Sequence, residues 1–135
     1  MTPLTTNRYT KHRDGIITAH PLKAATKIYK GSLVCADSTG YAVPGADAAS
    51  YVFLGVAIEE ADNSGGAAGA LSVRVQTSGI FSLAKSGTIT QASIGATLYI
   101  VDDQTVGLAA TTTNDIPCGR LEALDGADVW VRLAL

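Results

Sequence analysis

Short runs of alternating hydrophobic and polar residues fill the C-terminal two-thirds of the chain and predict β-strands. Residues 73–77 alternate one by one, and residues 80–83 resume the pattern after Ser78 and Gly79. Alternation places successive side chains on opposite faces of a strand, and a glycine suits the tight turn between two strands. We therefore expect a β-hairpin over residues 73–83.

Two more hairpins follow in the same style. Residues 97–101 and 105–108 are apolar runs separated by a polar turn, and residues 120–124 lead through Asp125 and Gly126 to residues 128–133. An Asp-Gly pair between two apolar runs is a strong hairpin signal. In the last run, Val129, Val131 and Leu133 should share one face of the strand, and Asp128, Trp130 and Arg132 the other.

A weak repeat links these segments. Gly31, Gly95 and Gly119 each open an apolar strand that ends in an aspartate-led turn and a returning strand. The spacing is too irregular for a solenoid or propeller. We therefore predict an all-β fold, a compact antiparallel β-barrel or sandwich of short hairpins, with little helix beyond single turns near residues 47–50 and 90–93. Residues 61–70 should form the longest loop.

Residues 1–21 lack a core pattern and are predicted to be an extended arm, with residues 22–135 forming a single β-rich domain. Residues 1–30 carry six basic residues and one acidic residue, whereas the rest carries four basic and eleven acidic residues. This asymmetry favours an arm that meets an acidic or polyanionic partner. A solvated terminus is the alternative interpretation.

Composition narrows the class of protein further. Charged residues make up 16% of the 135 residues, against about 25% in an average soluble domain. A weakly charged surface suits a protein covered by a partner, and equally a β protein rich in alanine and glycine. Cys35 and Cys118 lack metal-ligand spacing and are expected in the core. No apolar run approaches the length of a membrane span or of a secretory signal, so we expect a soluble protein made in the cytoplasm.

The sequence offers little catalytic chemistry. His12 and His20 lie in the irregular N-terminal part, and neither has a partner at nucleophile-triad spacing. Neighbouring carboxylates at Glu59-Glu60 and Asp102-Asp103 should point apart rather than act as a pair. The oxygen-rich run of Asp62, Asn63 and Ser64 lacks the ligand ladder of an EF-hand, and there is no phosphate-binding loop. We predict no catalytic, cofactor-binding or metal-binding residues.

The order of several short segments carries a resemblance to a known family. The segments are residues 27–34, 40–44, 54–57, 61–64, 67–69, 73–75, 78–81, 94–95, 101–106, 117–119 and 129–132. Over about residues 22–134 the chain resembles the small capsid cement, or head decoration, proteins of tailed bacteriophages and prophages. The longer basic N-terminus departs from the usual short start of that family.

The resemblance implies a non-enzymatic structural virion protein without a cofactor. It implies binding to the major capsid protein on the outer surface of the assembled head, often as a homotrimer at local three-fold positions. It implies synthesis in the host cytoplasm, and neither nucleic acid nor membrane as a partner. From the basic arm we add Arg8, Tyr9, Lys11 and Arg13 as expected contacts to the capsid surface or to a neighbouring subunit.

Three other classes of function stay open. A β-barrel adhesion or carbohydrate-binding module on the virion would cluster exposed aromatics in a groove. A small hydrolase would need a concave pocket that holds a histidine beside a carboxylate. A single-strand nucleic-acid binder would combine basic and stacking aromatic residues, and the acidic body disfavours it.

Overall fold

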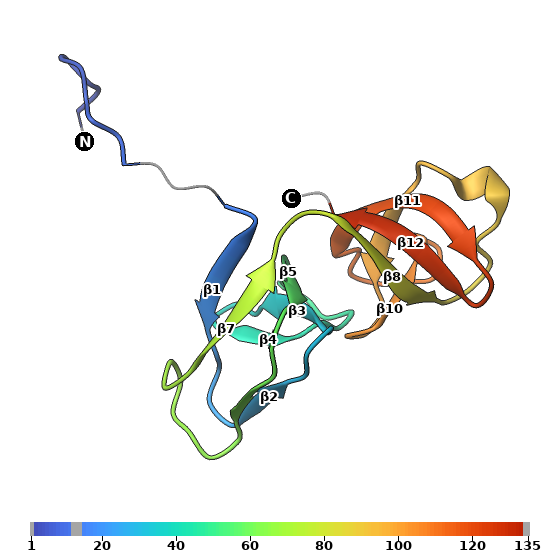
Figure 1. The fold of residues 1–135 in the computed structure, drawn as a ribbon, viewed down its shortest axis with the longest axis horizontal. Coiled ribbons are helices and arrows are strands. Elements are labelled where there is room, and N and C mark those ends of the chain that lie inside the picture. The colour runs from blue at the N-terminus through green and yellow to red at the C-terminus, as the bar shows by residue number, and fades with distance from the viewer. Residues whose placement is uncertain (1, 12–14, 134–135) are drawn as a thin grey trace.

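The computed structural model describes residues 2–11 and 15–133. Strands dominate these residues (Figure 1), in the order β1 (Ile17–Pro21), β2 (Thr26–Ile28), β3 (Leu33–Ala36), β4 (Ala42–Pro44), β5 (Val52–Ala57), β6 (Ala61–Asn63), β7 (Ser72–Gln76), β8 (Ile80–Lys85), β9 (Thr97–Ile100), β10 (Thr105–Gly107), β11 (Pro117–Asp125) and β12 (Asp128–Leu133). One 3-10 turn, η1 (Gln91–Ser93), lies where a single helical turn was predicted. No described helix is long and apolar enough to cross a membrane.

The strands form a sheet and a barrel side by side (Figure 1). The sheet has the order β1-β7-β5-β3-β4, with β2 and β6 pairing as a separate ribbon, and the closed barrel has the order β10-β8-β12-β11-β9. All these pairs are antiparallel except β8 with β10. The predicted all-β, mainly antiparallel fold is thus confirmed.

One hydrophobic core joins the two parts. Phe53 and Val56 of the sheet belong to the same buried cluster as Leu98, Val129 and Val131 of the barrel. A smaller cluster lies between the sheet and the β2–β6 ribbon. Complete burial of an aliphatic or aromatic side chain stabilises a fold by about 1.5–3 kcal/mol, so the shared cluster holds sheet and barrel together.

The three glycine-led repeats correspond to three hairpins. They are β3–β4, β9–β10 and β11–β12. In the first two turns the aspartate side chain stabilises the turn, because Asp37 accepts the backbone N–H of Thr39 at 2.9 Å and Asp102 accepts that of Gln104 at 2.9 Å. On β12 the two predicted faces separate: one is buried and consists of Val129, Val131 and Leu133, and the other is exposed.

The hairpin predicted over residues 73–83 is wrong. β7 pairs with β1 and β5 in the sheet, whereas β8 pairs with β12 and β10 in the barrel. Ser78 and Gly79 therefore carry the chain from one part to the other (Figure 1). Local alternation identified both strands correctly, but long-range pairing decided their partners.

Two further expectations are corrected. The turn predicted near residues 47–50 is not helical: the Tyr51 backbone N–H donates to the Ala48 carbonyl at 3.5 Å, but Ser50 has a φ of +66°. Asp47 accepts the backbone N–H groups of Thr113 and Asn114. The arm predicted over residues 1–21 is too long, because β1 forms an edge of the sheet in full register with β7. The predicted loop at residues 61–70 begins with β6.

Candidate interaction surfaces

An apolar groove opens where β7 leaves the sheet. It has a volume of about 630 Å³ and is lined by Thr18, His20, Tyr51, Val52, Phe53, Leu54, Thr77, Ile116 and Pro117. These residues come from β1, from β5 and the residue before it, from the residue after β7, and from the first residue of β11 and the one before it. None of them is a lysine, arginine, aspartate or glutamate, so the groove suits an apolar or aromatic group.

The groove leaves part of β5 without a second neighbour. β5 pairs with β7 only at Val56 and Ala57, whereas residues 52 and 53 pair with β3 alone among the described strands. Gly55 lies between the part of β5 that pairs with β7 and the part that does not. Its φ is +152°, and a Cβ added to it would lie 2.5 Å from the carbonyl oxygen of Gln76. Such a close approach admits only glycine.

His20 is the one sequence-predicted histidine that the groove contains. Its Nε2 lies 2.9 Å from the Thr18 hydroxyl, and burial lowers the pKa of its imidazole. Burial therefore favours the uncharged form of the ring. The concave pocket demanded by a hydrolase is thus present, but the lining provides no carboxylate beside the histidine. His12 lies outside the described residues.

The N-terminal arm is exposed at every described position from residue 2 to residue 11. Its two large apolar side chains stay in water, since Leu4 is 72% and Tyr9 91% exposed. Arg8 and Lys11 add positive charge, and residues 2–11 contain no acid. Arg13, the fourth expected contact, lies outside the described residues.

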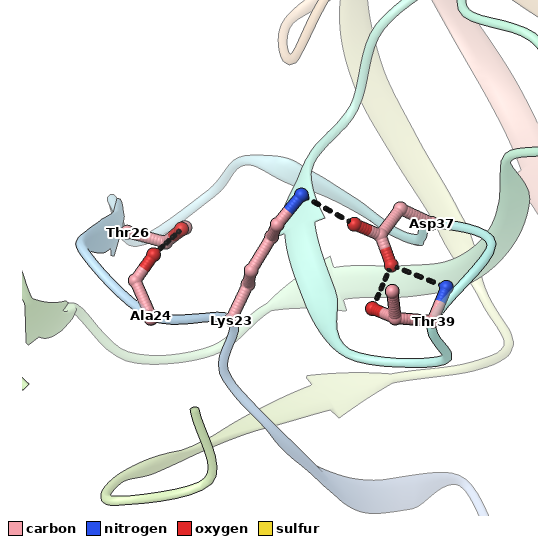
Figure 2. Close-up of polar contacts among 5 residues, drawn as sticks. All are labelled: Lys23, Ala24, Thr26, Asp37 and Thr39. Carbon is pink, nitrogen blue, oxygen red and sulfur yellow. Dashed lines mark hydrogen bonds and ion pairs between the residues drawn. The ribbon is translucent and has the colours of Figure 1, made fainter. Parts of the chain in front are cut away.

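Two lysines of the basic N-terminal region are paired within the body. Figure 2 shows Lys23, whose Nζ lies 2.8 Å from the carboxylate of Asp37, with Thr39 bonded to the same carboxylate. These contacts hold the pKa of Asp37 down at about 2. Lys27 lies 3.1 Å from Glu60. The charge asymmetry of the sequence is therefore partly internal, while Arg8 and Lys11 of the arm are exposed.

The acidic candidates have separate structural partners. The side chain of Glu59 accepts a hydrogen bond from Arg74 at 2.8 Å, while Glu60 pairs with Lys27. In the oxygen-rich run of residues 62–64, the Asn63 amide is buried and donates to the carbonyls of Lys23 and Ala67. The described residues contain no group of three or more histidines, cysteines or acids that could hold a metal ion.

Both cysteines lie in the shared core, as expected. Cys35 and Cys118 are free and fully buried, and burial raises the pKa of each thiol to about 12. A neutral, enclosed thiol is a poor nucleophile and metal ligand. We assign both residues to packing between the sheet and the barrel.

The outer face of the barrel carries an aromatic side chain among charges. Trp130 is 39% exposed on β12, and Glu122 forms ion pairs with Arg132 and Arg120 on the same face. The most exposed aromatics, Tyr9, Tyr29 and Trp130, lie on different elements. They do not form the aromatic groove expected of a carbohydrate-binding module.

Sequence reasoning found the arm and missed the groove. The groove arises because β7 pairs within the sheet and β8 pairs within the barrel, so the two strands diverge after Thr77. The partners of both strands lie far away in the sequence. The one sequence feature that could have indicated the groove is Gly55 in an otherwise apolar strand, since a glycine inside a strand marks a bulge or a close backbone approach.

Comparisons with known proteins add no identification. No protein-family model, no curated protein and no solved structure matches the chain.

Proposed function

We propose that the chain is a capsid cement protein that binds the outer surface of an assembled bacteriophage head and stabilises it. The order of sequence segments given above motivates the proposal. The observation that carries it furthest is the arm, because Leu4, Arg8, Tyr9 and Lys11 are all left uncovered by the protein's own body. Exposed aromatic and arginine side chains are the residues most enriched in binding hot spots.

The proposed mechanism is mass action on the assembled shell. A protein that binds only the assembled state stabilises that state by an amount that grows with its concentration relative to Kd. Contacts with several capsid subunits at once add avidity without new chemistry. In this proposal the partner is the major capsid protein, and the cement protein sits as a homotrimer at local three-fold positions.

Charge gives the arm its role on the capsid. Arg8 and Lys11 have no acid beside them in residues 2–11, whereas Lys23 and Lys27 are already neutralised by Asp37 and Glu60. The arm cations therefore keep their attraction for an acidic surface. Arg13 belongs to the same proposed contact set on sequence alone.

The test is binding to undecorated, expanded heads of the source phage, measured by co-sedimentation and bound copy number. The expected result is saturation at a copy number that matches the symmetry sites, with better survival of the decorated heads on heating. Absence of binding at micromolar protein overturns the proposal. A glycan screen would then test the adhesion-module alternative.

The contribution of the arm is tested by the double variant Arg8→Gln/Lys11→Gln. Two exposed ion pairs worth about 0.7 kcal/mol each predict about tenfold weaker binding, and a smaller difference at high salt. Lys30→Gln/Arg120→Gln makes the same charge change on the body and serves as the matched control. Equal losses for both double variants would rule out a specific role of the arm.

A further inference from the structure

We propose that the groove between the sheet and the barrel binds the N-terminal arm of a second copy of this chain, with Tyr9 as its anchor. The groove is a largely apolar hollow of about 630 Å³, and the arm holds the most exposed large apolar side chain of the described residues, Tyr9. The inference concerns the isolated protein and does not rest on the capsid proposal.

The groove has the backbone features that receive an extended segment. β7 runs beside β5 as far as Gln76 and then leaves, so residues 52 and 53 keep one edge without a partner strand among the described residues. An unpaired edge is a template for an added strand, whose main chain supplies hydrogen bonds while pockets take alternate side chains. Val52, which is 61% exposed, stands at this edge.

The arm has the composition that such a groove selects. Residues 7–11 adopt neither helix nor turn, so they need little rearrangement to lie along a strand. The groove lining is uncharged and largely apolar, which matches the ring of Tyr9. In an extended segment Arg8 points to the opposite face from Tyr9, which leaves its charge outside the groove.

Charge beside the groove fits a basic segment. Asp115 is exposed and directly precedes Ile116 of the lining, and Asp47 is bonded to the adjacent Thr113 and Asn114. Residues 101–119 contain no lysine or arginine to offset them. This acidic rim is complementary to Arg8 and Lys11, and such complementarity selects the arm over an acidic or purely apolar occupant.

The position of the arm favours exchange between molecules. The backbone N–H of Thr77 at the groove donates to the carbonyl oxygen of Ile16 at 2.7 Å, so the chain enters β1 at the groove itself. Beyond that point the arm extends away from its own body (Figure 1). An arm that leaves one copy and enters the next forms a head-to-tail contact, which gives a ring where the rotation between copies closes and an open filament where it does not.

The experiment compares oligomeric states of full-length proteins by sedimentation velocity over a concentration series. Tyr9→Asp removes the anchor but keeps the groove, and Val52→Lys charges the groove edge but keeps the arm. Pro117→Lys, on another wall, is a second groove variant in case Val52→Lys perturbs the sheet. Ile94→Lys places the same charge on an exposed apolar position of the barrel and is the control.

We expect the native chain and Ile94→Lys to self-associate, and each site variant to associate about thirtyfold more weakly, as for loss of a hot-spot aromatic.

A mixture of Tyr9→Asp with Val52→Lys should regain one interface and form heterodimers, because one partner has an intact groove and the other an intact arm. A native chain that stays monomeric at about 1 mM, or site variants that associate like the native chain, would overturn the inference. Capsid binding by a monomeric native chain would leave the proposed function standing while this inference fails.

Discussion

Single residues decide where charge is neutralised in this protein, and Asp37 is the clearest case. Its side chain is only 7% exposed, yet it carries a carboxylate held by Lys23 and by the hydroxyl and backbone N–H of Thr39. These contacts favour the ionised form and depress the pKa of Asp37 from its ordinary 3.8 to about 2. They also fasten the segment after β1 to the turn between β3 and β4 (Figure 2).

A depressed pKa makes folding stability depend on pH in a defined direction. Because the folded-state pKa is the lower one, the contribution of Asp37 is complete above about pH 4 and is lost as the pH falls towards 2. The unfolding midpoint in urea should therefore drop over this window, and drop less steeply in Asp37→Asn. Asp125→Asn, at the exposed end of β11, is the control. If the urea midpoint fell equally steeply with pH in the native protein and in Asp37→Asn, Asp37 would not be the source of the pH dependence.

Gly55 is the residue that shapes the groove, and its replacement has a sharp expected cost. A Cβ there would meet the Gln76 carbonyl at 2.5 Å, in a backbone conformation that other residues avoid. Gly55→Ala should lower the free energy of unfolding by about 1–3 kcal/mol. Gly65→Ala, which meets nothing within 4 Å, should change it by less than about 0.5 kcal/mol. Chemical denaturation measures both, and similar values for the two would refute the argument.

At the scale of elements, periodicity predicted the strands better than their partners. The alternation of β12 and the aspartate-led turns were sufficient to give the β9–β10 and β11–β12 hairpins, because both strands of each pair are adjacent in sequence. The same reasoning joined β7 to β8 wrongly, since nothing local distinguishes a hairpin turn from a passage between two sheets. β1 was missed because it is an edge strand of mostly exposed or half-buried residues, which leaves little hydrophobic signal.

For the candidate site too, sequence predicted the local feature, the arm, and not the groove, which depends on strand pairing. Residues 8, 9 and 11 were chosen from local charge and aromatic character, and the structure leaves all three exposed. The groove residues Thr18, Val52 and Pro117 come from three distant strands and share no motif. A surface assembled by topology can therefore be recognised only once the strand order is known.

The faces of β12 give an element-scale prediction. Val129 is fully buried in the barrel core, whereas its neighbour Asp128 points outward. Val129→Ala should cost about 2 kcal/mol through lost burial and the cavity it leaves, and Asp128→Ala should cost less than about 0.5 kcal/mol. Thermal unfolding of the two single variants measures the contrast. A reversed order would mean that β12 presents its other face to the core.

At the scale of the whole molecule, the shared core makes sheet and barrel dependent on one another. Phe53 is 5% exposed on β5 of the sheet and packs in the cluster that contains the inward side chains of β12. Removing such a ring usually costs about 3–5 kcal/mol. The cost should fall on both parts of the molecule, because the cavity would lie between them.

Trp130 makes this dependence measurable, since it is the only tryptophan in the chain and lies in the barrel. Its fluorescence reports on the barrel, whereas far-ultraviolet circular dichroism reports on all strands. Both signals should show one coincident transition in the native protein, as a single cooperative domain requires, and Phe53→Ala should shift both midpoints equally. Ile80→Ala, at an exposed barrel position, is the control and should shift neither. A Trp130 midpoint unmoved by Phe53→Ala would mean that the barrel unfolds on its own, and the chain would then comprise two domains joined at residues 77–79.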